Sequence, residues 1–162
     1  MGVITEEARR WAEKEFPAFE FTVSRRDIAQ FALATEANDP IHFDPAVAAA
    51  AGFDDVVAPS LFPYVIRMQA YNLVGRDHLE PDGSATADVP PLPARRAMAG
   101  ETVVEIGEPI VAGDIVTVKK RVVDLYEKEG RSGPLVFVQM EFVFQNQDER
   151  VVARERFTRI YR

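Results

Sequence analysis

A loop at residues 35–44, TEANDPIHFD, combines residue types that move protons. It contains His42, one of only two histidines in the chain, together with Glu36, Asp39 and Asp44. A histidine and a carboxylate that hold the same water molecule can provide both a base and an acid. The alternative is a hydrogen-bonded surface histidine in a loop whose acidic residues stabilise turns. The loop is therefore a candidate proton-transfer site, in which Glu36 or Asp39 would be the partner of His42.

The composition limits the classes of protein to which the chain can belong. With 162 residues, 47% of them apolar, it can bury one substantial core, and we expect a single domain over residues 1–162. Acidic residues outnumber basic ones by 26 to 19 without a long basic run, which argues against non-specific nucleic-acid binding. The absence of cysteine excludes disulfides, thiolate metal ligands and cysteine nucleophiles. The first residues contain no apolar signal segment, so a cytoplasmic location is the default expectation.

The segment before the loop is predicted to contain a helix, a strand and a second helix. Residues 5–16 predict a helix with Thr5 as its cap and Pro17 as its stop, and residues 19–24 alternate as a half-buried strand. The SRRD sequence at 24–27 is a Ser-x-x-Asp capping box for the second helix. That helix is predicted to turn four apolar side chains inward: Ile28, Phe31, Ala32 and Leu33. It leads directly into the loop that carries the histidine.

The segment after the loop predicts two further helices. Asp44 is a suitable cap for the first, Pro45 takes its first position, and Gly52 follows its end. The second helix covers residues 60–75, where Ser60 can act as the cap, and it is apolar on nearly all sides. Because this helix is too short to span a bilayer, we expect it to lie in the core, wrapped by a sheet, and we expect no membrane partner.

The C-terminal part changes to strand periodicity after a long irregular stretch at 76–98. Four segments rich in Val, Ile and Phe predict strands: 102–106, 115–126, 135–146 and 151–162. The short turns between them favour an antiparallel meander. With the earlier strand and the helices, they make an α+β domain whose sheet must curve around the helix at 60–75.

An antiparallel sheet curved around a central helix is the hot-dog fold, and the order of several stretches agrees with it. FALATEANDPIHFDPAVAAAAGF, then VVAPSLFPYV, then EPIVAGDIVTV resembles the MaoC-like family of (R)-specific enoyl-CoA hydratases and 3-hydroxyacyl-thioester dehydratases. The likeness is greatest to the N-terminal MaoC dehydratase branch, the FAS1-type dehydratases. It runs from about residue 17 to the end of the chain.

The resemblance implies an enzyme that adds water to trans-2-enoyl thioesters or removes it from (3R)-3-hydroxyacyl thioesters. The substrates would be thioesters of coenzyme A (CoA) or of acyl carrier protein (ACP), and no metal or redox cofactor would be needed. The resemblance also implies an assembly with a second hot-dog chain, either a homodimer or a heterodimer.

The proton-transfer residues carry over from the family only in part. The family's loop reads Asp-x-Asn-Pro-x-His, and its aspartate and histidine hold the reacting water. His42 matches the histidine, but counting back places Ala37 at the aspartate and Asp39 at the asparagine. A second alignment treats Asp39 as an extra residue and keeps Glu36 and Asn38 as the Asp and Asn. The resemblance therefore implies His42 as catalytic, with Glu36 or Asp39 as its carboxylate and Asn38 beside the substrate.

The thioester-binding turn carries over in form. In VAPSLF, Ser60 lies where many relatives have glycine, at the expected start of the central helix. Backbone N–H groups at a helix start have no partner within the helix and lie at the positive end of its dipole. They suit a thioester oxygen that becomes enolate-like. The resemblance thus implies Ser60 and Leu61 as substrate-binding residues.

Three functions follow and stay open on the sequence alone. The first is an active hydratase or dehydratase in a homodimer. The second is a non-catalytic, acyl-chain-binding subunit of a heteromeric hot-dog dehydratase, whose sister chain carries the complete motif. The third is a domain that binds acyl thioesters without catalysis. The retained His42 favours the first over the third, and the loss of the standard aspartate favours the second over the first.

Overall fold

The computed structural model describes residues 3–12, 14–72, 90–93 and 96–162. Five helical segments precede most of the sheet: α1 (Glu6–Arg9), α2 (Arg25–Ala34), η1 (Pro40–His42), α3 (Pro45–Ala50) and α4 (Pro63–Asn72). The strands are β1 (Phe19–Thr22), β2 (Ala97–Ile106), β3 (Ile115–Gly130), β4 (Gly133–Gln145) and β5 (Val151–Tyr161). In this part of the chain, no helix is long and apolar enough to cross a membrane.

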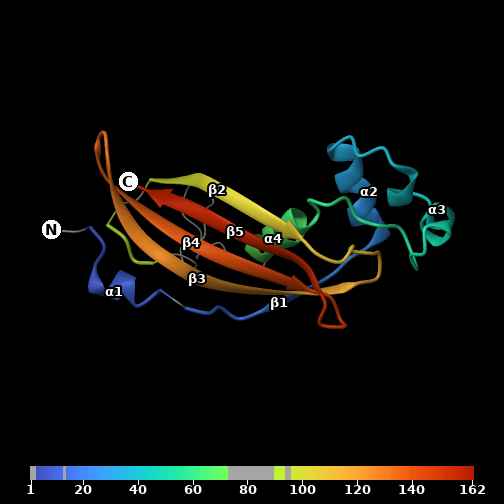
Figure 1. The fold of residues 1–162 in the computed structure, drawn as a ribbon, viewed down its shortest axis with the longest axis horizontal. Helices are drawn as coiled ribbons and strands as arrows, with labels where there is room; N and C mark the ends of the chain where they lie inside the picture. Colours follow the sequence, from blue (N-terminus) through green and yellow to red (C-terminus); the bar gives the residue numbers. More distant parts are fainter. Residues whose placement is uncertain (1–2, 13, 73–89, 94–95) are drawn as a thin grey trace.

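The five strands form one antiparallel sheet in the order β1-β3-β4-β5-β2 (Figure 1). The hairpins β3–β4 and β4–β5 confirm the predicted meander. β2, however, pairs with β5 at the far edge and not with β3, which follows it in sequence. The chain between them crosses the end of the sheet, where the N–H of Ala58 donates to the carbonyl of Ile110 at 2.8 Å. This crossing places the connector, residues 107–114 between β2 and β3, close to the residues that precede α4.

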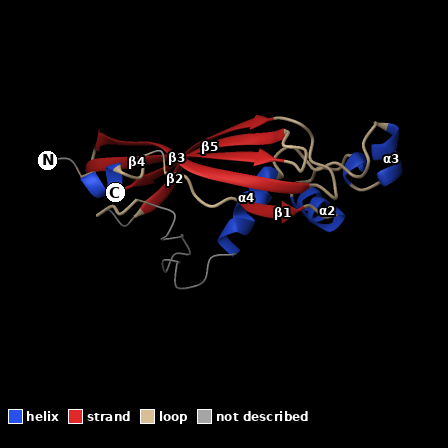
Figure 2. Ribbon diagram, turned by 90° about the horizontal axis from the view of Figure 1, so that it is seen from below, coloured by secondary structure: helices blue, strands red, loops and turns tan. Residues whose placement is uncertain are grey.

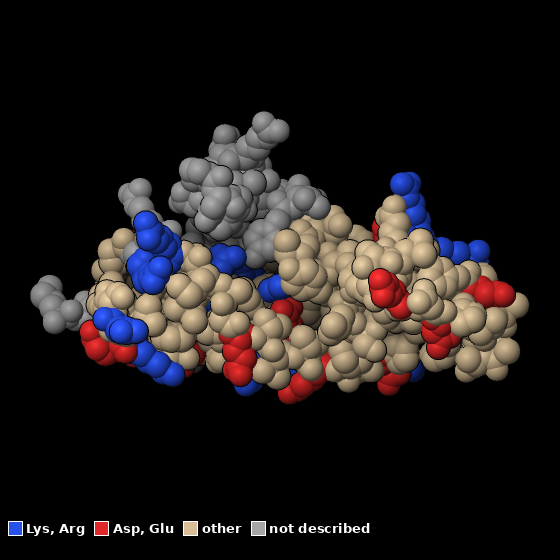
Figure 3. Space-filling model, turned by 90° about the horizontal axis from the view of Figure 1, so that it is seen from above, with Lys and Arg blue, Asp and Glu red and all other residues tan. Residues whose placement is uncertain are grey.

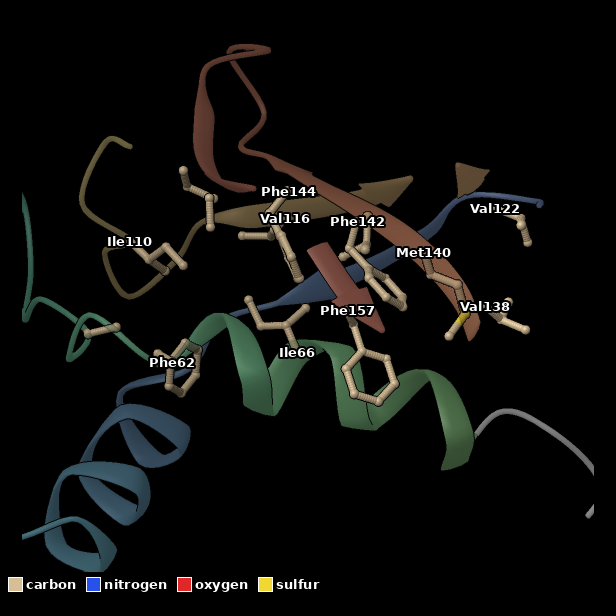
Figure 4. Close-up of a cluster of buried hydrophobic side chains, with 14 of the residues drawn as sticks. Phe62, Ile66, Ile110, Val116, Val122, Val138, Met140, Phe142, Phe144 and Phe157 are labelled. Carbon is tan, nitrogen blue, oxygen red and sulfur yellow. The ribbon is translucent and has the colours of Figure 1, made fainter. Parts of the chain in front are cut away.

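Helix α4 lies against one face of the curved sheet (Figure 2). Ile66 of α4 and Phe62, which directly precedes the helix, are fully buried against sheet side chains, among them Val116, Phe142 and Phe157 (Figure 4). The other side of the helix is open, since Tyr64 is 52% exposed and Met68 is 41% exposed. The sheet of this chain therefore covers α4 on one side only, whereas the sequence predicted a helix wrapped in the core.

The predicted N-terminal helix at 5–16 is wrong beyond Arg9. The side chain of Thr5 caps α1 as expected, accepting from the N–H of Ala8 at 3.1 Å, but the helix has only four residues. Further on, Glu15 forms an isolated antiparallel bridge with Arg121 of β3, and the N–H of Phe16 donates to a β3 carbonyl at 3.0 Å. Pairing with the sheet therefore outweighs helix propensity in this segment, because extended backbone satisfies the edge of β3.

The two helices around the candidate loop begin and end as their caps predict. The capping box of Ser24 and Asp27 is present at α2, and Asp44 caps α3 with Pro45 in the first turn. Of the four α2 residues predicted to face inward, Ile28 and Ala32 are fully buried and Phe31 packs against the core. The fourth, Leu33, is 67% exposed, so its predicted burial is wrong. It lies beyond the ~100° stripe that a helix of this kind buries.

Two predicted boundaries are wrong on either side of the segment at 73–89. Helix α4 begins at Pro63, three residues after the predicted cap Ser60, because a turn closed by the N–H of Phe62 and the carbonyl of Pro59 at 2.8 Å precedes it. Strand β2 begins at Ala97, before the predicted residue 102, and a register irregularity lies between Ala99 and Thr102. The predicted irregular stretch at 76–98 falls mostly outside the described residues.

Candidate active site

A cavity of about 450 Å³ opens at the end of the sheet where α4 begins. Four segments form its wall: the loop that contains η1, the turn before α4, the connector after β2, and the start of β5. The residues of the wall that bear on its chemistry are Ala37, His42, Ser60, Pro63, Glu108 and Val152. Elements far apart in the sequence therefore meet in one cavity, and the loop at 35–44 contributes part of its wall.

His42 is held at the wall of the cavity in a defined orientation. It ends η1, and its Nδ1 lies 2.7 Å from the carbonyl oxygen of Val57. Val57 also donates its N–H to the carbonyl of Ile41 at 3.1 Å. Two hydrogen bonds therefore hold the η1 loop to Val57, one through the His42 ring and one through the backbone of the residue before it. A carbonyl oxygen can only accept, which makes Nδ1 the protonated nitrogen of the neutral ring. The lone pair is then on Nε2, as a general base requires.

The carboxylates of the loop are placed differently from the histidine. Asp39 caps η1, where its Oδ1 accepts from the N–H of Ile41 at 3.0 Å. Glu36 follows the end of α2 with a left-handed backbone (φ 56°). Neither residue belongs to the wall of the cavity, and Asn38 does not either. From this stretch only Ala37 reaches the wall beside His42. The structure thus brings an alanine, and no carboxylate of the loop, to the cavity.

The turn before α4 carries the two predicted thioester-binding residues. Ser60 lines the cavity, while the neighbouring Leu61 is 60% exposed. Both residues precede α4, so their N–H groups belong to the turn before the helix, whereas the sequence placed them at the helix start. In the described part of the chain neither N–H has a backbone partner. Their use by a thioester oxygen stays a prediction.

One ionisable residue of the wall was not found from the sequence. Glu108 lies in the connector after β2, on the side of the cavity formed by residues 106–110. Glu108 is the first residue of the EPIVAGDIVTV stretch, which contributes to the family resemblance, but the sequence assigned it only the role of a turn residue between two strands. Nothing in a single sequence relates this connector to a loop so far upstream, because the crossing over the end of the sheet creates the proximity.

A buried ion pair lies one helical turn beyond the cavity. Arg67 follows Pro63 by one turn of α4, and its Nε is 3.2 Å from Oε2 of Glu155 on β5. Both side chains are almost fully buried, and the guanidinium carbon lies 4.8 Å from the ring centroids of Tyr64 and Phe157. Burial raises the pKa of Glu155, and the charge of Arg67 opposes that rise. The pair joins α4 to β5, two elements whose first residues line the cavity.

No cluster of three or more potential metal ligands occurs among the described residues. On the face seen in Figure 3, basic and acidic side chains are interspersed, without a large area of one sign. The chemistry available in the described wall is therefore that of an imidazole, a carboxylate, a hydroxyl and backbone N–H groups.

A curved antiparallel sheet against a central helix, with a histidine-lined cavity at the start of that helix, defines a hot-dog protein of the hydratase and dehydratase type. Residues 10–155 match the family model described as "FAS1-like, dehydratase domain region", and the chain belongs to this family. The predicted family and the predicted hot-dog fold are both confirmed.

Curated relatives extend the family likeness without naming an activity. The "UPF0336 protein" of Clavibacter michiganensis is 38% identical over 98 residues, covering 60% of this chain and 58% of the relative. That of Thermobifida fusca is 32% identical over 111 residues, covering 68% of this chain and 66% of the relative. The chain thus spans less than two thirds of the length of these relatives.

Solved structures agree in fold. The unliganded R-hydratase PhaJ1 from Pseudomonas aeruginosa has a TM-score of 0.66 at 18% identity, with 91% of this chain and 79% of that chain covered. The HadBC complex, a (3R)-hydroxyacyl-ACP dehydratase from Mycobacterium tuberculosis, has a TM-score of 0.68 at 18% identity, with 93% and 96% covered. The ChsH1-ChsH2 complex from the same organism has a TM-score of 0.64 at 18% identity, with 93% and 98% covered.

Proposed function

We propose that this chain hydrates trans-2-enoyl thioesters of CoA or ACP, or dehydrates (3R)-3-hydroxyacyl thioesters in the reverse direction. The observation that carries the proposal is the orientation of His42. Its Nδ1 is fixed by the carbonyl of Val57, and the ring stands at the wall of a cavity that could receive the reacting part of an acyl chain. Membership of a dehydratase family supports the same reaction.

In the proposed reaction His42 acts on water. As the water oxygen bonds to C3, Nε2 takes one of its protons, and the electron pair of the C2–C3 double bond moves to C2. The charge that develops passes to the thioester oxygen, for which the N–H groups of Ser60 and Leu61 are available donors beside the cavity. C2 must also gain a proton, so the reaction needs an acid in addition to His42.

A second candidate function is a subunit that shapes the acyl site of a heteromeric dehydratase. It is favoured by Ala37, which stands at the wall where the first alignment puts the family's aspartate, and by Asp39, whose carboxylate caps η1. HadBC and ChsH1-ChsH2, two heteromeric complexes, are among the proteins of similar fold. In this case the complete motif would belong to the sister chain.

Either function includes a second hot-dog chain as partner. Strand β2 is an edge of the sheet, and an unpaired edge can pair with another chain. On the side away from the sheet, α4 and the turn before it expose Leu61, Tyr64 and Met68. A partner that paired with β2 and also covered these apolar side chains would satisfy both the edge and the exposed surface, which supports a homodimer or a heterodimer.

Hydration assays on purified protein test the proposal. Crotonyl-CoA and longer enoyl-CoA thioesters are offered to the wild-type chain and to His42→Ala, with the thermal midpoint of each as a folding control. We expect His42→Ala to lower kcat by about a hundredfold or more at an unchanged midpoint. Asp39→Asn, which can still cap η1, and Glu36→Gln separate the two alignments of the loop.

The second candidate makes the opposite forecast. There the chain would be inactive at every chain length, would gain activity with a hot-dog chain that carries the complete Asp-x-Asn-Pro-x-His motif, and would then be indifferent to His42→Ala. That combination would refute catalysis by this chain. Inactivity under both conditions would leave only the binding of thioesters.

A further inference from the structure

The proposed function leaves His42 without an acid, and the structure offers a candidate in another segment of the cavity wall. Among the described residues of the wall, His42 and Glu108 are the only ones with ionisable side chains. His42 comes from the loop at η1, while Glu108 comes from the connector after β2. Two residues that could act as acid and base on one substrate therefore line the same cavity from different segments of the chain.

Glu108 is held at its wall by the backbone on both sides of it. The N–H of Gly107 donates to the carbonyl of Val152, and the N–H of Glu108 donates to the carbonyl of Val151, both at 3.0 Å. A Cβ atom on Gly107 would come within 2.1 Å of the Val151 oxygen, so this close approach requires glycine. Pro109 then fixes the backbone on the other side. The backbone of Glu108 is thus held as a strand residue's would be, while its side chain is exposed to solvent.

The walls that carry the two residues are joined by a continuous backbone network. Val57 accepts from Nδ1 of His42 at 2.7 Å and forms an isolated antiparallel bridge with Val111. The next residue, Ala58, donates to the carbonyl of Ile110 at 2.8 Å, two residues after Glu108. The segments that carry His42 and Glu108 are therefore held next to each other by hydrogen bonds to and between their backbones.

We propose that Glu108 is the carboxylate that works with His42 in this cavity; the inference rests on the proposed hydratase function. Glu108 would then take the role of carboxylate partner to His42 that the sequence assigned to Glu36 or Asp39. Asp39 is occupied as the cap of η1, and neither of them reaches the wall. Glu108 does reach it, and its backbone N–H, not its side chain, makes the contact that holds the connector in place.

The two groups share one proton in each catalytic cycle. In hydration, Nε2 of His42 takes a proton from water as the oxygen bonds to C3, and the carboxylic acid of Glu108 gives its proton to C2. The cycle leaves an imidazolium and a carboxylate, and transfer of one proton from His42 to Glu108 through water restores both. Dehydration runs the same steps backwards. The net change is one water molecule added or removed, and no other reactant is needed.

The test compares Glu108→Gln with Glu129→Gln on the full chain. Glutamine keeps the size and hydrogen-bonding capacity of Glu108 but cannot transfer the proton. Glu129 loses the same charge at the exposed far end of β3, away from the cavity. We expect Glu108→Gln to lower kcat for crotonyl-CoA by about a hundredfold or more with KM changed much less, and Glu129→Gln to leave both unchanged.

The pH dependence of the rate separates proton transfer from a merely structural role. With an acid and a base that share one proton, kcat/KM should rise and then fall with pH, and Glu108→Gln should remove one limb of that curve. Glu108→Asp should restore part of the rate, because it returns the acid at a shorter reach. Thermal midpoints of all variants should agree with that of the wild type.

Each outcome bears on the inference in a definite way. An active wild type with Glu108→Gln within about threefold of it would overturn the role of Glu108 and leave the proposed function standing. A chain that is inactive alone and with a partner would remove the proposed function, and the inference with it. Activity that needs a partner and ignores both His42→Ala and Glu108→Gln would place the chemistry in the other chain and equally overturn the inference.

Discussion

The buried pair of Arg67 and Glu155 allows a prediction whose magnitude follows from the structure. The two side chains are almost fully buried, yet neither Nε of Arg67 nor Oε1 of Glu155 has a hydrogen-bond partner among the described residues. The 3.2 Å contact is therefore a charge attraction without the aligned hydrogen bonds that offset the cost of burial. Removal of one partner leaves the other charge buried alone. Replacement of both removes the charges together.

The perturbation is a double-mutant cycle with Arg67→Met and Glu155→Leu, which keep similar volumes. We expect Arg67→Met to cost about 3–5 kcal/mol, because Glu155 then loses the one cation that lies within salt-bridge distance of it among the described residues. Glu155→Leu should cost less, since the guanidinium of Arg67 keeps its contacts with the rings of Tyr64 and Phe157. The double variant should lie within about 1 kcal/mol of the wild type or above it.

Urea unfolding at fixed pH measures the cycle, with the exposed pair of Arg121 and Glu141 as the control. Arg121→Gln breaks a 2.7 Å contact whose arginine is half exposed, and it should cost about 1 kcal/mol or less. Costs of Arg67→Met and Glu155→Leu that simply add in the double variant would refute the reasoning, because additive sites do not compensate each other.

The pH dependence of the same pair has a definite sign. Burial raises the pKa of Glu155 above its ordinary value, so the folded state holds this proton more tightly than the unfolded state does. Stability from this group is then complete below the ordinary glutamate pKa and is lost as pH rises through the raised one. In Glu155→Gln this downward slope should be absent. If the free energy of unfolding of the wild type and of Glu155→Gln changed in the same way with rising pH above the ordinary glutamate pKa, the assignment to Glu155 would be contradicted.

Two further predictions concern the wall of the cavity and the open side of α4. Gly107→Ala should destabilise the chain by about 1–3 kcal/mol and displace the connector, since its Cβ would meet the Val151 oxygen at 2.1 Å. Urea unfolding measures this cost, and a variant as stable as the wild type would contradict the close approach. Met68→Glu should weaken the proposed assembly, whereas Ile115→Glu, at an equally exposed apolar position, should not; sedimentation velocity of the two variants compares them, and equal behaviour would remove α4 from the interface.

Where local chemistry decides the structure, the sequence was a sufficient guide. The capping box at Ser24, the cap at Asp44 and the glycine that ends α3 act within a few residues of themselves, and all three are found as predicted. The strands of the meander follow from their alternation and short turns. By contrast, the extent of α1 was decided by the pairing of Glu15 with β3, which no local pattern records.

The residues of the candidate site show the same difference between what near neighbours in the sequence decide and what long-range pairing decides. His42 could be predicted to lie at the site because the residues that mark it are its sequence neighbours, and it does line the cavity. Glu108 belongs to a segment that reaches the cavity only by crossing the end of the sheet. The position of β2 beside β5, and not beside β3, creates that crossing. A sequence that predicts a meander of consecutive strands places the connector elsewhere, so the missed residue follows from the missed strand order.

The cavity and the open side of the molecule share a boundary. Ile106 ends the edge strand β2, lines the cavity and is 50% exposed, and Ser60 of the cavity wall is followed by the exposed Leu61. A chain that paired with β2 and covered α4 would therefore also close this side of the cavity. Exclusion of bulk water strengthens the electrostatic interactions of an imidazole, a carboxylate and a thioester oxygen. Assembly and catalysis are thus expected to depend on each other, and a variant that weakens the partner contact should lose activity even though His42 and Glu108 are intact.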